Sequence, residues 1–535
     1  MQLKLNTVFL LIPAVAILAG GCSMEKEDKT DSRPNILVIL ADDMGYSDIG
    51  CYGGEIETPN LDRLAADGLR IRNIYNGARC CPTRASLLTG LYPHEAGIGG
   101  MVRHGDKIPE SGPYQGYLSL ESVTIAEVLR EAGYSTYLSG KWHVGEWPDF
   151  WPRKRGFDRY FGLINGASSY FEIDQVPRVL QMVQDDTPWT PPAEGFYMTN
   201  AFTEHAVKFI DEHHQTTESN PFFLYLAYTA PHWPLHALEE DMDKYRGMYD
   251  AGWDSLRVRR FARQRELGLV DGRYELPRRP ESIPAWDDLP DADKKEWAAR
   301  MEAYAAMVDR MDQGIGEVLE ALRRHDALDN TLIFFLSDNG ACAVDVGAQK
   351  IHDPAKQPGQ RGSYLAYLEP WAFLSNTPYR QYKQWTYEGG IASPLIVHWP
   401  EGISDKGVIR KHTGHVMDIM ATVVDVTGAT YPEEYAGRKI KPLRGESLLP
   451  AIRGEHTDPE RILCWEHYGS KAIRKGNWKL VQGQNSTTWE LYNLETDPVE
   501  IHDMSTREPE LKKELLNVYS AWAKDMGVNQ RKKNR

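Results

Sequence analysis

The chain has 535 residues, of which 41% are hydrophobic and 26% are charged, the proportions of an ordinary globular protein. Its formal net charge of -15 argues against a nucleic-acid binder, because such proteins usually carry a basic stripe. The negative net charge does not exclude an anionic substrate, since a few cationic side chains at a site can outweigh the electrostatic field of the whole protein. The length suits one large α/β domain with a small appendage as well as it suits several domains.

The N-terminus is predicted to be a targeting segment. Lys4 precedes the apolar run "VFLLIPAVAILAG", which is short for a membrane span, and small residues lead to Cys22. The pattern resembles a bacterial lipoprotein signal, although Ala19 stands where Leu is more common. An ordinary secretory signal is the alternative. We expect a signal peptide over 1–21, a lipid anchor at Cys22, a polar tether over 22–33, and a location in the bacterial periplasm or at the cell surface.

Four continuous apolar runs predict buried strands. They are "NILVIL", "PFFLYLA", "NTLIFFLS" and "SPLIVHW", each bounded by polar or turn residues. Helical patterns lie between them, including one that starts at Thr58 and Pro59 and stops at Gly68. This alternation predicts a mostly parallel sheet covered by helices on both faces, and sites in such sheets form beyond the carboxyl ends of the strands.

Two later regions have a different texture. Residues 248–297 are rich in charge, proline and arginine, and are predicted to be a surface insertion with helical pieces. Near Glu455 the pattern changes to short alternating strands followed by an amphipathic helix. We therefore expect a large domain over 34–455 and a small antiparallel sheet with one helix over 456–535.

The six cysteines raise a separate question. They do not form a CxxC pair, which makes a structural zinc site unlikely, and they are too sparse for a disulfide framework. In "ARCCPTRASLLTG", Pro82 is predicted at the first helical position and Gly90 at the end of the helix. Cys80 and Cys81 would then lie at a helix N-terminus, where a thiol is either a low-pKa nucleophile or an inert core residue.

Paired oxygen ligands follow two of the predicted strands. Asp42 and Asp43 end the first, and Asp338 and Asn339 end the third. Like charges side by side become favourable around a hard cation, so the four side chains suit Ca²⁺ or Mg²⁺ if the two strand ends are neighbours. If either pair is considered alone, a strand-end turn or a helix cap is a better interpretation than a metal site.

Cationic side chains also collect after predicted strands. They are Lys141, His143, His232 and Lys383. A lone lysine or histidine is usually a solvated residue. Several of them near a metal site in an acidic protein indicate a tetrahedral oxyanion such as sulfate or phosphate as the ligand.

These motifs together resemble the type I sulfatases. The stretch Cys80-Cys81-Pro82-Thr83-Arg84 with "ASLLTG" is similar to the C-x-P-x-R…TG signature of that family. The blocks "ADDMGYSDIGCYGG", "GKWHVG", "APHWP", "FLSDNG" and "YEGGIASPLIVHWP" follow in the family's order. The resemblance covers most of the chain and implies an alkaline-phosphatase-like α/β fold, with 34–455 as the catalytic domain.

The resemblance also assigns roles. Cys80 would be oxidised to formylglycine by a separate maturation enzyme, and Cys81 occupies a variable position. One Ca²⁺ would be bound by Asp42, Asp43, Asp338 and Asn339. Arg84 would support the formylglycine, Lys141 and Lys383 would bind sulfate, and the catalytic histidines would be His143 and His232.

The implied reaction is sulfate-ester hydrolysis, with a sulfated carbohydrate or aryl sulfate as substrate. A hydroxyl of the hydrated aldehyde would attack sulfur, His232 with Lys383 would protonate the leaving alcohol, and His143 would take the proton that lets sulfate depart. A phosphonate or phosphodiester hydrolase on the same scaffold is the main alternative, and a non-catalytic binding protein is a third. Candidate specificity elements are 103–117, 165–172, 248–297, Trp371 and His467.

Overall fold

The computed structural model describes residue 2 and residues 33–173, 181–216, 220–344, 351–455, 458 and 460–528. Apart from residue 2, the predicted signal peptide lies outside these residues, as do Cys22 and all of the tether except Arg33. In the described part of the chain, no helix combines the length and the apolar character needed to cross a membrane.

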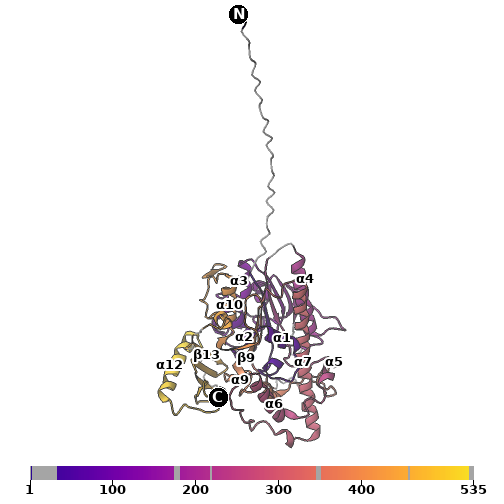
Figure 1. Cartoon of the computed structure of the whole chain (residues 1–535), viewed down its shortest axis with the longest axis vertical. Coiled ribbons are helices and arrows are strands. Elements are labelled where there is room, and N and C mark those ends of the chain that lie inside the picture. Colours follow the sequence, from indigo (N-terminus) through magenta and orange to yellow (C-terminus); the bar gives the residue numbers. More distant parts are fainter. Residues whose placement is uncertain are drawn as a thin grey trace.

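A ten-stranded mixed sheet forms the centre of the molecule (Figure 1). In spatial order its strands are β10 (Val408–His415), β2 (Leu69–Tyr75), β9 (Ala392–His398), β8 (Thr331–Ser337), β1 (Asn35–Ala41), β7 (Phe222–Ala227), β3 (Ser135–Gly140), β4 (Arg159–Leu163), β5 (Met182–Gln184) and β6 (Thr187–Trp189). Strand β9 is antiparallel to β2 and β8, and β5 is antiparallel to β4 and β6. All other neighbouring strands of this sheet are parallel. The mostly parallel sheet predicted from the sequence is therefore confirmed.

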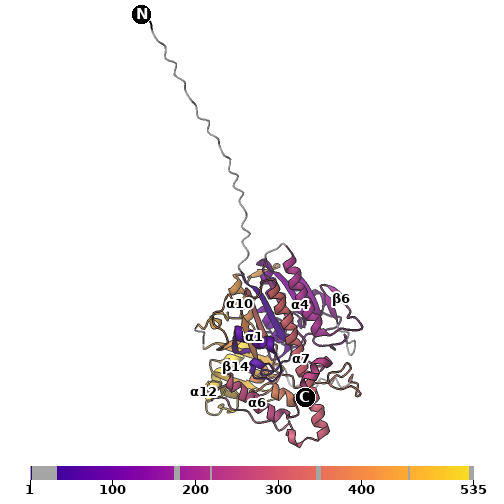
Figure 2. The same cartoon turned by 45° about the vertical axis from the view of Figure 1, so that its right-hand side comes forward.

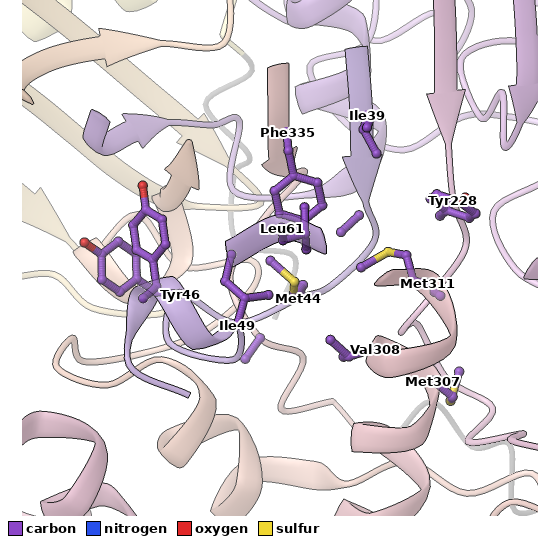
Figure 3. Close-up of a cluster of buried hydrophobic side chains, with 14 of the residues drawn as sticks. Ile39, Met44, Tyr46, Ile49, Leu61, Tyr228, Met307, Val308, Met311 and Phe335 are labelled. Atoms are coloured by element: carbon purple, nitrogen blue, oxygen red, sulfur yellow. The ribbon is translucent and has the colours of Figure 1, made fainter. Parts of the chain in front are cut away.

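Helices cover both faces of this sheet, because side chains of a strand alternate between them. One hydrophobic cluster, part of which Figure 3 shows, contains Ile39 of β1, Leu61 of α1 (Pro59–Asp67) and Met307, Val308 and Met311 of α7 (Asp291–Arg324). The same face holds α4 (Met198–Gln215). The opposite face packs against α2 (Cys80–Thr89), α3 (Ile125–Glu131) and α10 (Asp418–Thr427).

The small C-terminal unit is the predicted antiparallel sheet with one helix. Its strands β13 (Ile462–His467), β14 (Ser470–Lys475), β15 (Trp478–Gln482) and β16 (Glu490–Asn493) pair in chain order, and α12 (Pro509–Asp525) packs on them. Figure 2 shows α12 and β14 across the molecule from β6. The remaining α-helices and β-strands are α5 (Glu239–Met242), α6 (Gly252–Glu266), α8 (Leu368–Ser375), α9 (Glu388–Ile391), α11 (Leu449–Ile452), β11 (Glu434–Tyr435) and β12 (Arg438–Lys439).

A buried charge cluster joins the two sheets. Lys479 of β15 is fully buried, and its Nζ lies 2.7 Å from Glu388 Oε1 and 2.8 Å from Glu500 Oε1. Tyr75 at the end of β2 donates a 2.9 Å hydrogen bond to the other oxygen of Glu388. Removing one partner of such a cluster would leave an uncompensated buried charge, so these contacts hold the C-terminal sheet in one position.

Two expectations about local structure were wrong. Helix α2 begins at Cys80, so Pro82 is the third helical residue and not the first. Region 248–297 is not simply a surface insertion, since Trp253 and Trp286 are buried. Their ring centroids lie 5.3 and 5.8 Å from that of Trp371. This aromatic packing offsets the free-energy cost of burying part of a charge-rich segment.

Candidate active site

Four adjacent strands deliver the predicted site residues to one edge of the sheet. The order β8-β1-β7-β3 places the carboxyl ends of these parallel strands side by side. The register is level, since Ala41 pairs with Ser337 and Leu40 with Ala227. The residues that follow these strands are the predicted ones, namely Asp338 and Asn339, Asp42 and Asp43, His232, and Lys141 with His143.

The two aspartates after β1 each contact a lysine. Lys141 Nζ donates a hydrogen bond to Asp42 Oδ2. Lys383 Nζ donates to both carboxylate oxygens of Asp43, at 2.6 and 2.7 Å. All four side chains are buried. Burial raises the pKa of Asp43, but Lys383 and His232 more than offset this, and the pKa falls to about 2.

The third carboxylate, Asp338, is held by Arg84 of α2. The Nε and Nη2 of Arg84 donate to Asp338 Oδ2 at 3.0 and 2.9 Å, and its Nη1 donates to the backbone oxygen of Lys141 at 3.2 Å. The other Asp338 oxygen accepts from the backbone N–H of Asp43 at 3.2 Å. Burial and the charge of Asp42 nevertheless raise the pKa of Asp338 to about 8, so this carboxyl needs further positive charge to stay ionised.

Helix α2 places Cys80 at its first position beside these charges. The turn before it is fixed by hydrogen bonds from Gly77 N–H to Thr83 Oγ1 (2.8 Å) and from Gln384 N–H to the Ala78 oxygen (2.7 Å). The latter bond ties the Lys383 segment to the start of the helix. A hydrogen bond from Cys81 lowers the pKa of Cys80 well below its usual value, with help from the nearby Lys141, His143 and Lys383, against the effect of burial.

Cys81 lies beside His143, which the sequence alone did not indicate. Its Sγ is 3.3 Å from His143 Nε2 and 3.7 Å from the sulfur of Met101. Sγ of Cys80, Sγ of Cys81 and a His143 nitrogen lie within 4.8 Å of one another. On its other side the His143 ring meets Gly166, where a Cβ would come within 2.5 Å of Nε2. Only a glycine at this position lets segment 165–172 approach the ring so closely.

Both histidines are neutral at physiological pH. Burial lowers the pKa of His143 to about 3 and that of His232 to about 4. The Nδ1–H of neutral His232 donates to the Trp233 oxygen at 2.6 Å, which leaves Nε2 as an acceptor 3.3 Å from Asp43 Oδ2. Two acceptors that face each other favour a proton or a cation between them, so His232 is placed to take up and release a proton.

The oxygen-rich edge fits a hard metal ion. Asp42 Oδ1 and Asn339 Oδ1 are buried without a hydrogen-bond partner in the described part of the chain. Oxygen atoms of Asp42 and Asp43 lie with a nitrogen of His232 within 4.8 Å of one another. Asn339 also donates to Asp43 Oδ1 at 2.8 Å, which orients its own oxygen. Unpaired buried oxygens are costly, and a cation would satisfy them.

Two of the predicted specificity residues, Trp371 and His467, lie in different surroundings. Trp371 is fully buried in the aromatic cluster with Trp253 and Trp286, so it is not placed to contact a ligand. His467 ends β13 close to the start of α2, since the ring of the next residue, Tyr468, lies 5.8 Å from the Arg79 guanidinium. Arg79, the residue before α2, was missed, although its place next to the cysteine pair was a usable signal.

Comparisons with known proteins agree with this geometry. The Sulfatase family profile matches residues 34–429, and a profile described as "N-sulphoglucosamine sulphohydrolase, C-terminal" matches residues 379–521. The chain is 36% identical to an uncharacterized sulfatase of Schizosaccharomyces pombe, over 93% of this chain and 94% of that protein. It is 35% identical to an arylsulfatase of Klebsiella aerogenes, over 81% of this chain and 94% of that one.

A solved structure shows the same overall arrangement. Ps i-CgsB in complex with k-i-k-neocarrahexaose superposes with a TM-score of 0.68 at 28% identity, over 92% of this chain and 93% of that one. The family profile spans more than half of the chain, and the strand-end constellation occupies the matched region. The chain therefore belongs to the sulfatase family and is a sulfuric ester hydrolase, with the alkaline-phosphatase-like fold expected from its sequence.

Proposed function

We propose that this sulfatase removes sulfate from sulfated carbohydrates, using a formylglycine made from Cys80. The observation that carries the proposal is the position of Cys80, at the first residue of α2 and beside Lys141, His143 and Lys383. The carbohydrate part is supported by relatives named N-acetylgalactosamine-6-sulfatase, for example the human protein at 28% identity, and by the k-i-k-neocarrahexaose in the structure of Ps i-CgsB.

The modified residue and the metal would supply the chemistry that ordinary side chains lack. A formylglycine hydrate at position 80 would be the nucleophile toward sulfur, and a cation held by Asp42, Asp43, Asp338 and Asn339 would neutralise charge on the sulfate oxygens. Oxygen-only ligands favour Ca²⁺ or Mg²⁺ over thiophilic metals, and we propose Ca²⁺. The maturation enzyme that converts Cys80 is the partner this proposal requires.

The chain's own residues bind the sulfate and move the protons. Lys141 and Lys383 are buried, each beside one of the two adjacent aspartates, and their ammonium groups would bind the sulfate oxygens. His232, fixed through Nδ1, presents Nε2 to the leaving alcohol and would donate a proton to it once that nitrogen has itself been protonated. His143 lies against Cys81 and close to Cys80, so it is placed to accept a proton from position 80. Arg84 holds Asp338 in place.

Metal binding can be tested without turnover. In Asp43→Asn the charge that pairs with Lys383 is lost while the shape is kept, so bound calcium should fall from about one per chain to less than a tenth. The measurement is elemental analysis by mass spectrometry after dialysis against a buffer that is stripped of trace metals and then supplied with Ca²⁺ and Mg²⁺ in known ratio. The exposed Asp67→Asn is the matched control and should keep its calcium. Full calcium in Asp43→Asn would contradict the assigned ligand set.

The adjacent cysteines allow a matched pair of variants. After co-expression with a formylglycine-generating enzyme, the wild-type peptide spanning Cys80 should show the mass of an aldehyde in place of a thiol. Cys80→Ala should lose at least about 10³-fold in kcat for 4-nitrophenyl sulfate, because the nucleophile is gone. Cys81→Ser should still be converted at position 80 and should keep activity within about tenfold. Conversion at Cys81, or an active Cys80→Ala variant, would refute the assignment.

The substrate class is tested with a panel. The mature enzyme would be assayed on N-acetylgalactosamine 6-sulfate, N-acetylglucosamine 6-sulfate, carrageenan oligosaccharides, 4-nitrophenyl sulfate and bis(4-nitrophenyl) phosphate. We expect kcat/KM for at least one sugar sulfate to exceed that for the phosphate diester by more than about 10³-fold, since the chain belongs to the sulfatase family. A preference for the diester would favour the phosphodiesterase alternative.

We also propose that the chain is a lipoprotein of the bacterial periplasm or cell surface, anchored at Cys22. Lys4, the apolar run that follows it and the small residues before Cys22 support this. Expressed in a bacterium, the wild type should fractionate with membranes, and Cys22→Ala should shift to the soluble fraction, because one thioether-linked lipid group provides the attachment. A soluble wild type would instead favour an ordinary secretory signal.

A further inference from the structure

Strand β13 ends at His467, whose side chain is buried between neighbouring segments. The residues on both sides of His467 contact segments that themselves border the catalytic groups. Trp465 Nε1 donates to the Asn76 oxygen at 2.9 Å, just before the turn that leads to Cys80. Ser470 Oγ accepts from the backbone N–H of Thr386 at 2.9 Å, three residues after Lys383. His467 is therefore held between the start of α2 and the Lys383 segment.

The turn that carries His467 is also braced from the other side. Glu466 accepts hydrogen bonds from His94 Nε2 at 3.2 Å and from the Tyr114 hydroxyl at 3.0 Å, and its second oxygen accepts from Gly469 N–H at 3.0 Å. Tyr114 belongs to the loop 103–117. Two other segments, those of His94 and Tyr114, thus brace the hairpin tip on this side and restrain the position of the His467 ring.

His467 has polar atoms with nothing to bind. Its side chain is fully buried, yet neither Nδ1 nor Nε2 has a hydrogen-bond partner among the described residues. Buried polar atoms are nearly always paired, and an unpaired one costs about 1–3 kcal/mol. The neighbouring Arg79 also has a buried Nε without a partner in the described part of the chain, and its guanidinium lies 5.8 Å from the centre of the Tyr468 ring.

The chemistry of the ring selects the kind of group it would bind. A neutral imidazole offers one N–H donor and one acceptor nitrogen. This matches a hydroxyl group, which donates once and accepts, and it does not match the sulfate oxygens, which only accept. His467 belongs to the C-terminal sheet, whereas the sulfate-binding lysines follow β3 and precede α9. The His467 ring is thus suited to contact the alcohol part of the sulfate ester, and not its sulfate group.

We infer that His467, assisted by Arg79, binds a hydroxyl of the leaving sugar and sets which sugar sulfate this enzyme accepts. The inference rests on the proposed carbohydrate function and adds a positioning residue to it. His467 orients the sugar relative to position 80 and does not take part in bond cleavage. A substrate without hydroxyl groups next to the ester makes no such hydrogen bond, so replacing His467 should leave its kcat/KM nearly unchanged.

The test compares two substrates in the mature full-length enzyme. His467→Ala should lower kcat/KM about 10- to 100-fold for the best of N-acetylgalactosamine 6-sulfate, N-acetylglucosamine 6-sulfate and carrageenan oligosaccharides, chiefly through KM. It should change kcat/KM for 4-nitrophenyl sulfate by less than about threefold. His467→Gln keeps a donor and an acceptor and should recover part of the loss. His502→Ala, an exposed histidine of the same C-terminal region, should behave as wild type.

Three results would overturn the inference. Equal losses on both substrates would place His467 in the sulfate chemistry, and no loss on either would make it a structural residue whose nitrogens bind water. A wild type that cleaves 4-nitrophenyl sulfate but none of the sugars refutes the carbohydrate proposal itself, and the inference with it. That failure appears in the wild type, whereas a failure of the inference alone appears only in the variant's substrate ratio. If His467→Ala is unstable by thermal unfolding, His467→Gln decides the ratio.

Discussion

The pairing of three buried carboxylates with three buried cations is the constraint on which the site depends. Asp42, Asp43 and Asp338 are fully or almost fully excluded from water within one small volume. Their mutual repulsion is offset by Lys141, Lys383 and Arg84, each of which contacts a different carboxylate. Breaking one buried pair typically costs about 3–5 kcal/mol, because the remaining charge has no water to solvate it. The elements that carry these six residues must therefore keep their relative positions.

The sheet satisfies this constraint through its register. Strand β1 lies between β8 and β7 with all three running parallel, so the three strand ends stop at one level. Helix α2 then closes the cluster from above the sheet edge, since Arg84 reaches both Asp338 and the backbone of Lys141. The same use of buried charge attaches the C-terminal sheet, where Lys479 lies between Glu388 and Glu500. Glu388 follows Lys383 by five residues, so the two charge clusters are joined through one short segment.

This arrangement separates two tasks. The groups proposed to act on sulfate follow the strands of the large sheet and begin α2, where neighbouring charges and the register restrain them. The groups proposed to contact the sugar are His467, at the tip of the β13 hairpin, and Arg79, the residue before α2. A family that shares one reaction can therefore vary its substrate by changing the second set, because those residues take no part in the buried charge cluster.

Much of the fold followed from local patterns. Continuous apolar runs predicted β1, β7, β8 and β9, and the polar residues after three of them marked the site edge, because parallel strands end at a common edge. The signature around Cys80 and the order of the motif blocks identified the family. Local rules failed at Pro82, where α2 starts two residues earlier than a proline at the first position predicts. They also failed at Trp371, whose burial depends on Trp253 and Trp286, more than 80 residues away along the chain.

The sequence by itself determined the fold class, the family, and the residue types at each strand end, since these depend on periodicity and on short motifs. Only the tertiary structure decided which strand ends are neighbours, which lysine contacts which aspartate, and that His467 from the last sheet lies beside the first turn of α2. Asp43 and Lys383 are separated by 340 residues, and Arg84 and Asp338 by 254. No local preference encodes such pairs, because they form only when the register of the whole sheet brings distant segments together.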